Sequence, residues 1–136
     1  MKTLTPQFSI NILNKNAVSA LFMILISTFG GSSILAQAPW IEWQKSLGGS
    51  NTDVAEYVQQ TIDGGYIVAG YSSSNDGDAS GNHGSSDFWV VKLTPTGTLE
   101  WQKSHGGSNV DIATSLQQTL DGGYIVSGAS KSSDGD

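Results

Sequence analysis

The stretch NDGDASGNHGSSD, residues 75–87, is rich in side chains that could bind a metal ion. Counted from its first aspartate, it matches a twelve-residue calcium loop, with side-chain oxygens at positions one, three, five and twelve and glycine at position six. Calcium prefers six to eight hard oxygen ligands, which this alternation turns toward one point. The predicted ligands are the side chains of Asp76, Asp78, Ser80 and Asp87 and the backbone carbonyl of Asn82.

The same stretch also fits a plain solvated connection. Asp, Asn, Ser and Gly are the residues that dominate any exposed loop. Asp87 is a shorter ligand than the usual glutamate, Gly84 at position nine could contribute only through water, and strand-like rather than helical segments flank the loop. Calcium binding and simple connection therefore both stay open.

A catalytic centre is harder to find. Sugar hydrolases need two carboxyl groups roughly 5 to 10 Å apart, but Glu42 and Glu100 are equivalent positions of a repeat, as are Asp53 and Asp111. His105 aligns with a leucine in the other copy. Residues that recur with the repeat indicate scaffold rather than catalyst, so we predict no catalytic residue. The two repeated aspartates are expected to bond backbone amides in turns.

The repeat itself is plain. The segment that begins WQKSLGGSN at Trp43 returns as WQKSHGGSN at Trp101, a period of 58 residues, with 25 of 36 aligned positions identical. A third trace occurs in PWIEWQKS (39–46), which resembles GTLEWQKS (97–104). Apolar exchanges between the copies, such as Val58 to Leu116 and Ile62 to Leu120, are typical of buried positions.

Each period contains four strand-like segments joined by turn signals. Asp-Gly is a strong two-residue hairpin signal, and proline followed by Thr-Gly favours a second tight turn. The expected strands are 54–62, 66–72, 88–93 and 98–104, with turns at 63–65 and 94–97. This pattern predicts an all-β fold built from four-stranded antiparallel β-propeller blades, with a β-sandwich or β-solenoid as alternatives. Gly70 and Gly128, inside strands, suggest a bulge or close packing.

Strand connections alternate between the two ends of such a blade. The GGSN turns and the long loop are therefore expected at one end and the tight hairpins at the other. Trp43 and Trp101 are expected to pack between blades, and Trp40 is the best candidate for an exposed ring.

The chain divides into four predicted parts. Residues 1–38 form a secretory signal peptide, with Lys2 and Lys15 before the apolar run 17–29 and small residues at its end. The apolar run is too short to span a bilayer. Next come a lone outer strand with its turn (39–53), a complete blade (54–104) and a truncated blade (105–136). A propeller needs at least four blades, so the sequence is expected to be a fragment of a longer protein.

Charge narrows the choice of partners. Without residues 1–38 the chain keeps four lysines against twelve acidic residues, a net charge of −8, and it has no arginine. Phosphate binding depends on clustered Lys and Arg, so nucleic acid is not an expected partner. Cysteine is absent, which excludes disulfides and thiolate chemistry.

The motifs DGGYIVAG, DFWVVKL and LEWQKSLGGS together resemble the repeat of large secreted or surface-attached β-propeller-like proteins of the Bacteroidetes type. Many such proteins end in a type IX secretion sorting domain, which this sequence lacks. The resemblance covers residues 40–136 and implies a propeller at an extracellular or outer cell-surface location, but no defined activity.

The sequence therefore favours a non-catalytic exported module that binds polysaccharide or a surface protein, with the remaining blades of the longer chain as further partners. Functional loops are usually the long ones on a rigid scaffold. A glycan-degrading hydrolase with its catalytic residues outside this sequence and a structural adhesion repeat are the alternatives. Calcium is the one candidate cofactor, and no transmembrane segment is expected after the signal peptide is removed.

Overall fold

The computed structural model of the protein describes residues 8–13 and 40–135. Within those ranges the chain is all-β, with eight strands and no helix. The strands are β1 (Phe8–Leu13), β2 (Ile41–Leu47), β3 (Asp53–Gln60), β4 (Tyr66–Ser72), β5 (Asp87–Leu93), β6 (Leu99–His105), β7 (Asp111–Gln118) and β8 (Tyr124–Ser130).

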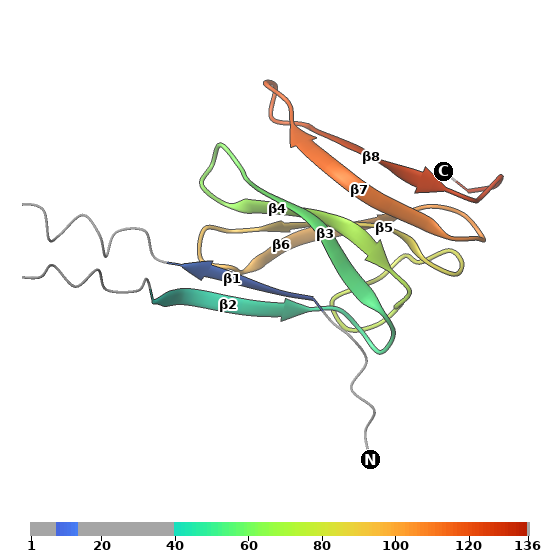
Figure 1. Cartoon of the computed structure of the whole chain (residues 1–136), viewed down its shortest axis with the longest axis horizontal. Helices are drawn as coiled ribbons and strands as arrows, with labels where there is room; N and C mark the ends of the chain where they lie inside the picture. Colours follow the sequence, from blue (N-terminus) through green and yellow to red (C-terminus); the bar gives the residue numbers. More distant parts are fainter. Residues whose placement is uncertain (1–7, 14–39, 136) are drawn as a thin grey trace, which may run out of the picture.

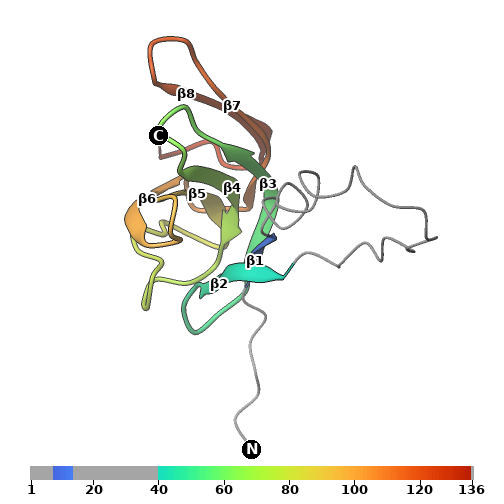
Figure 2. The ribbon, with the colours of Figure 1, turned by 90° about the vertical axis from the view of Figure 1, so that its left-hand side faces the viewer.

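The strands form three antiparallel sheets (Figure 1). A four-stranded sheet in the order β3-β4-β5-β6 lies between the pairs β1-β2 and β7-β8, and Figure 2 shows the three sheets one after another. The predicted all-β antiparallel class is therefore confirmed, and every strand expected from the repeat forms within one residue or two of its predicted bounds.

Both hairpin turns in the four-stranded sheet use a glycine with positive φ. Gly64 (φ 82°) donates its N–H to the Thr61 carbonyl, and Gly97 (φ 80°) donates to the Thr94 carbonyl. Only glycine adopts this conformation without steric cost. The first turn spans Thr61 to Gly65, so the predicted two-residue Asp-Gly hairpin is wrong by its width: Asp63 caps the turn with a side-chain bond to the Gly65 N–H.

The strand glycine Gly70 stands opposite a bulge, as predicted. The register of β3 against β4 shifts between Ala55, which faces Gly70, and Tyr57. A Cβ on Gly70 would lie 1.9 Å from the Val54 carbonyl oxygen, so no other residue fits there. Gly128 has the same relation to Ile112 in the second copy.

A buried lysine ties the hairpin end of this sheet together. The Nζ of Lys92, whose side chain is only 4% exposed, lies 2.9 Å from the Asp63 carboxylate and 3.0 Å from Glu100. Burial alone would lower the pKa of Lys92, but the bonds to Asp63 and Glu100 outweigh it and raise that pKa. The same lysine, after a larger effect of the Thr61 hydroxyl, helps lower the pKa of Asp63 to about 2.

Strand β1 differs from the predicted domain boundaries. Residues 41–46 were expected as a lone strand, yet β2 pairs along its length with Phe8–Leu13, inside the predicted signal peptide. The alternation in FSINIL explains the strand, because Phe8 and Ile10 are buried against the four-stranded sheet while Ser9 is exposed. A segment interpreted as a removable leader is not searched for strands. The apolar run 17–29 and the predicted cleavage site lie outside the described residues.

Two apolar cores fill the spaces between the sheets. The first joins β1 and β2 to one face of the four-stranded sheet and contains Phe8, Ile10, Leu47, Val68, Ala79, Trp89, Val91 and Leu93. The second joins the other face to β7 and contains Ile67, Ala69, Val90, Ala113 and Leu116. Trp43 packs on the first core and donates its indole N–H to the Pro95 carbonyl, as expected for a residue between sheets.

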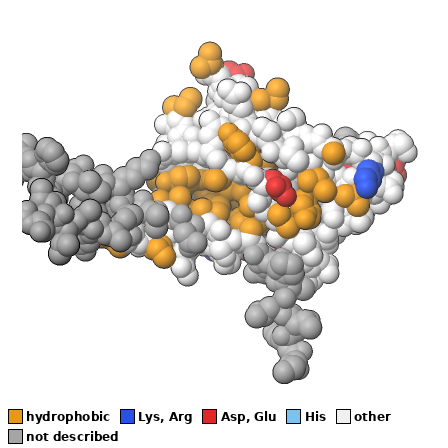
Figure 3. Space-filling model, in the orientation of Figure 1, with side chains coloured by type: hydrophobic (Ala, Val, Ile, Leu, Met, Phe, Trp, Pro, Cys, Tyr) orange, Lys and Arg blue, Asp and Glu red, His pale blue; other side chains and the backbone are white. Residues whose placement is uncertain are grey.

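Apolar exchange between the copies proved an unreliable guide to burial. Leu116 is 2% exposed, but its equivalent Val58 is 51% exposed, and Ile62 and Leu120 are 79% and fully exposed. The last two stand in hairpin turns, where no strand passes over them. Hydrophobic side chains gather on the face viewed in Figure 3, over the middle of the molecule. Trp40, 50% exposed, is the exposed ring that the sequence predicted.

Candidate functional site

The long loop between β4 and β5 lies at the same end as the turns that connect successive sheets. The Asp78 N–H donates to the Gly48 carbonyl at 3.0 Å, and the Ser50 N–H donates to the Asp76 carboxylate at 2.7 Å. Asn51 likewise donates its N–H to the Ser74 hydroxyl. The predicted sharing of one end by the loop and the GGSN turns is therefore correct.

The far side of the loop reaches the next turn along the chain. The Asp111 N–H donates to the Ser86 carbonyl at 2.6 Å, and a Cβ on Gly84 would lie 2.4 Å from the Gly107 carbonyl oxygen. The loop thus bridges two equivalent turns 58 residues apart. It is part of a connected surface rather than a free excursion into solvent.

Each of these turns is organised by one buried aspartate. Asp53, 1% exposed, accepts the Gly49 N–H at 2.8 Å and the hydroxyls of Ser72 and Ser74 at 2.5 and 3.0 Å. The predicted bond from this carboxylate to a backbone amide is confirmed. Without these donors a buried carboxylate would be strongly unfavourable.

Asp111 repeats the arrangement in the second copy. It accepts the Gly107 N–H at 2.9 Å and the Ser132 hydroxyl at 2.7 Å. Burial is the largest single influence and would raise the pKa of Asp111, but the bonds from Ser130, Gly107 and Ser132 together outweigh it. The pKa of Asp111 is therefore well below its usual range, and the carboxylate stays ionised.

The predicted metal ligands have separate hydrogen-bond partners. Asp76 caps the first turn, Ser80 accepts the Gln102 amide N–H at 2.5 Å, and the Asn82 amide donates to the Ser72 carbonyl at 2.8 Å. Asp78 binds the first turn through its backbone N–H. Among the residues that the structure describes, no group of three or more acidic or histidine side chains is placed to hold a metal ion. The calcium hypothesis remains a prediction.

Asp87, the proposed twelfth ligand, begins β5 and is fully buried. One carboxylate oxygen accepts the His83 N–H and lies 2.8 Å from His83 Nδ1, and the other has no hydrogen-bond partner in the described structure. The Asp87 carboxylate therefore orients the half-exposed His83 ring. No serine hydroxyl within residues 40–135 bonds this ring, so the pair has no nucleophile beside it.

A polar hollow of about 350 Å³ lies where the loop meets β6. Its walls are formed by Ser80, Gly81 and His83 of the loop and by Gln102, Lys103, Ser104 and His105 of β6. The Ser104 hydroxyl and the Gln102 amide bond Ser80, which fixes the loop against the strand. Hydroxyl, amide, imidazole and ammonium groups suit a polyhydroxylated or anionic ligand.

Sequence reasoning did not find this hollow. It considered His83 and His105 singly and treated QKSH in β6 as an ordinary repeat segment. The available signal was the period-two alternation of β6, which places Lys103 and His105 on one face. The contact between β6 and the loop, 22 residues apart in the chain, has no such signal.

Comparisons of this chain with protein-family models, with curated protein sequences and with solved structures found no match. In the part of the chain that the structure describes, there is no helix long and apolar enough to cross a membrane.

Proposed function

We propose that the chain is an exported β-propeller repeat module that binds polysaccharide at its long-loop end without catalysing a reaction. The observation that carries the proposal is the polar hollow between the loop and β6, which offers His83, Gln102 and Lys103 on a scaffold of paired strands. Sugar hydroxyls are bound through several such donors and acceptors at once, and the described hollow contains no pair of carboxylates for glycoside hydrolysis.

The propeller part of the proposal rests on repetition. The four-stranded antiparallel sheet has the strand number and order of a blade. The strands on either side of it repeat its registers, as β7-β8 repeats β3-β4 with the same bulge. Export and a secreted or outer-surface location follow from the proposed signal peptide and from the resemblance to the Bacteroidetes repeat.

Affinity electrophoresis through gels that contain soluble polysaccharides tests the binding. Retardation of the full chain is expected in at least one neutral or acidic polysaccharide. Lys103→Ala and His83→Ala are expected to weaken the binding about tenfold each, a change of about 1.4 kcal/mol. Thr96→Ala at the opposite, hairpin end is the matched control and should have no effect.

Two results would contradict the proposal. Retardation that Thr96→Ala abolishes and Lys103→Ala does not would place the ligand elsewhere. Release of reducing sugars from a retarding polysaccharide would make the chain a hydrolase. No retardation in any gel, together with binding to immobilised cell-surface protein, would favour the adhesion alternative.

A further inference from the structure

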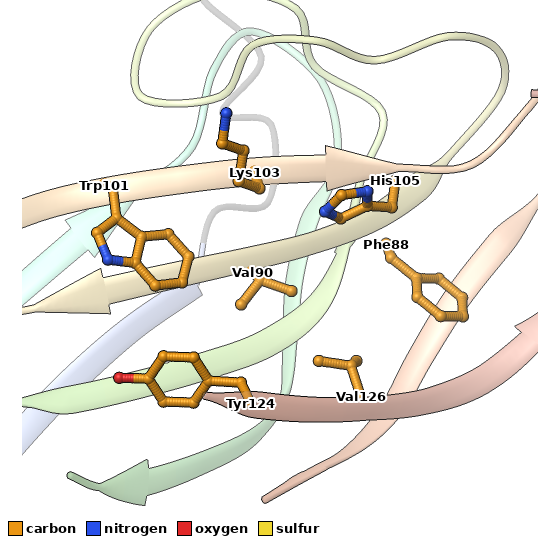
Figure 4. A pocket seen from close by; sticks show the side chains of 7 residues that line it. All are labelled: Phe88, Val90, Trp101, Lys103, His105, Tyr124 and Val126. Carbon is orange, nitrogen blue, oxygen red and sulfur yellow. The ribbon is translucent and has the colours of Figure 1, made fainter. Parts of the chain in front are cut away.

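A second hollow, of about 360 Å³, lies between β5, β6 and β8 and is mainly apolar (Figure 4). It is lined by Phe88, Val90, Trp101, Lys103, His105, Tyr124 and Val126. Figure 4 shows the Phe88, Val90, Trp101, Tyr124 and Val126 side chains around the open space and Lys103 turned away from it. The hollow therefore has apolar walls and no described side chain in its centre.

The equivalent walls elsewhere in the molecule enclose a filled core. On β2, β4 and the strand paired with β2, the positions that correspond to the lining are Phe8, Ile10, Trp43, Lys45, Leu47, Tyr66 and Val68. The correspondence of β1 with β5 is fixed by register, because Phe8 pairs with Leu47 as Phe88 pairs with His105, and both ladders shift before their last pair. Six of these seven residues contribute to the first core.

What fills that core is the strand beside β4. Trp89 of β5 is 1% exposed, and its ring centroid lies 5.3 Å from that of Phe8. Val91 and Leu93 follow on the same face and are fully buried. Nothing occupies the corresponding place beside β8, which among the described strands pairs with β7 alone.

We infer that the hollow and the outer edge of β8 together form a seat for a β-strand with the sequence pattern of β5, Asp-Phe-Trp-Val-Val-Lys-Leu. The pairing of β4 with β5 sets the register: the aspartate of the incoming strand lies opposite Ser130 and its last leucine opposite Tyr124. The tryptophan then enters the hollow and packs on Phe88, as Trp89 packs on Phe8. An added strand also satisfies the open backbone groups of β8.

The tryptophan pattern distinguishes this occupant from β1 of a second copy. At the positions equivalent to Trp89 and Val91, β1 carries Ser9 and Asn11. Two short polar residues would leave most of a 360 Å³ apolar hollow empty. The inference concerns how the repeat assembles, and it stands whether or not the long-loop end binds polysaccharide.

The test extends the full chain. A copy of residues 79–105 is joined after Asp136, which aligns with Asp78, so that the added strand follows its loop in the natural spacing. The control extension carries Trp89→Ser and Val91→Asn in the added copy only. Hydrogen exchange of the β8 amides, urea unfolding and gel filtration are measured on the original chain and on both extended chains.

The extended chain is expected to be monomeric and to exchange the outward β8 amides at least about a hundredfold more slowly, with a higher urea midpoint. The control extension should leave these amides close to the rate of the original chain. Equal exchange in the original and extended chains would overturn the inference, and so would equal protection by the control. Concentration-dependent protection in the unextended chain would overturn it in favour of a second copy.

Discussion

Strands β4 and β8 have almost the same sequence, YIVAGYS and YIVSGAS, but different surroundings. Ile67 in β4 is fully buried, whereas its equivalent Ile125 in β8 is 61% exposed. Strand β5 pairs with the outer edge of β4, and β7 packs over its face, whereas the described structure has neither beside β8. In this repeat, burial is decided by the neighbouring strand rather than by the residue.

The first strand of each copy shows the opposite asymmetry. Val58 of β3 is 51% exposed, while Leu116 of β7 is buried against Ile67 and Ala69 of β4. The pair β1-β2 supplies no counterpart of β4 to cover β3. Each flank of the four-stranded sheet therefore has half of what would enclose it, and the halves are complementary: two outer strands on one side and two inner strands on the other.

The largest effect is expected for the residue that fills the first core. Trp89→Ala removes a buried ring, its contact with Phe8 and the bond from its indole N–H to Gln102. The free energy of unfolding should fall by about 3 to 5 kcal/mol in urea denaturation. Trp101→Ala, on the wall of the open hollow and 37% exposed, should cost roughly 1 to 2 kcal/mol. Equal losses would mean that the two interfaces are equally packed.

The equivalent isoleucines give a matched pair of smaller size. Ile67→Ala should lower the free energy of unfolding by about 2 to 5 kcal/mol, because it leaves a cavity in the second core. Ile125→Ala should change it by no more than about 0.5 kcal/mol. Chemical denaturation of both variants measures the difference, and a large loss for Ile125→Ala would show that β8 is covered in solution.

The turn aspartates sharpen the comparison further. Asp111→Asn removes an acceptor for buried donors and should cost about 1 to 3 kcal/mol at pH 7. Asp53→Asn should cost more, because its partner Ser72 is buried while the equivalent Ser130 is exposed. Urea midpoints of the two variants, measured side by side, give the order.

Acid should remove the contribution of Asp111. Its pKa is lowered in the folded state, so the unfolded chain takes up the proton first, near the ordinary value of 3.8. The stabilisation is complete above that pH and is lost as the pH falls below it. The difference between the original chain and Asp111→Asn should therefore shrink from pH 6 to pH 2, and a constant difference would contradict the lowered pKa.

Calcium is expected to have the smallest effect. If the loop at 76–87 takes up calcium as its spacing predicts, titration calorimetry of the full chain should show binding that Asp76→Ala and Asp78→Ala abolish. Asp134→Ala, in the second copy, is the matched control. A flat titration would leave the loop as the hydrogen-bonded bridge between turns that the structure displays.

Local signals in the sequence were enough for the strands, the turns and the end at which the loop lies. Gly70 marked its bulge because a side chain there would strike the Val54 carbonyl, and Pro95 with Gly97 marked the second hairpin. Long-range facts had no such signal. The exposure of Val58 depends on a strand that β1-β2 does not supply, and the oxygens proposed for one calcium ion are used singly by Ser50, Gln102 and His83.

Amide hydrogen exchange in the unmodified chain tests the contrast between β4 and β8 most directly. The account predicts that amides along all of Tyr66–Ser72 are protected, because β4 has a paired strand on each side. In Tyr124–Ser130, only amides directed at β7 should be protected, and the alternate ones should exchange near the rate of an open chain. Equal protection along both strands would contradict the claim that the neighbouring strand, and not the repeat sequence, decides burial.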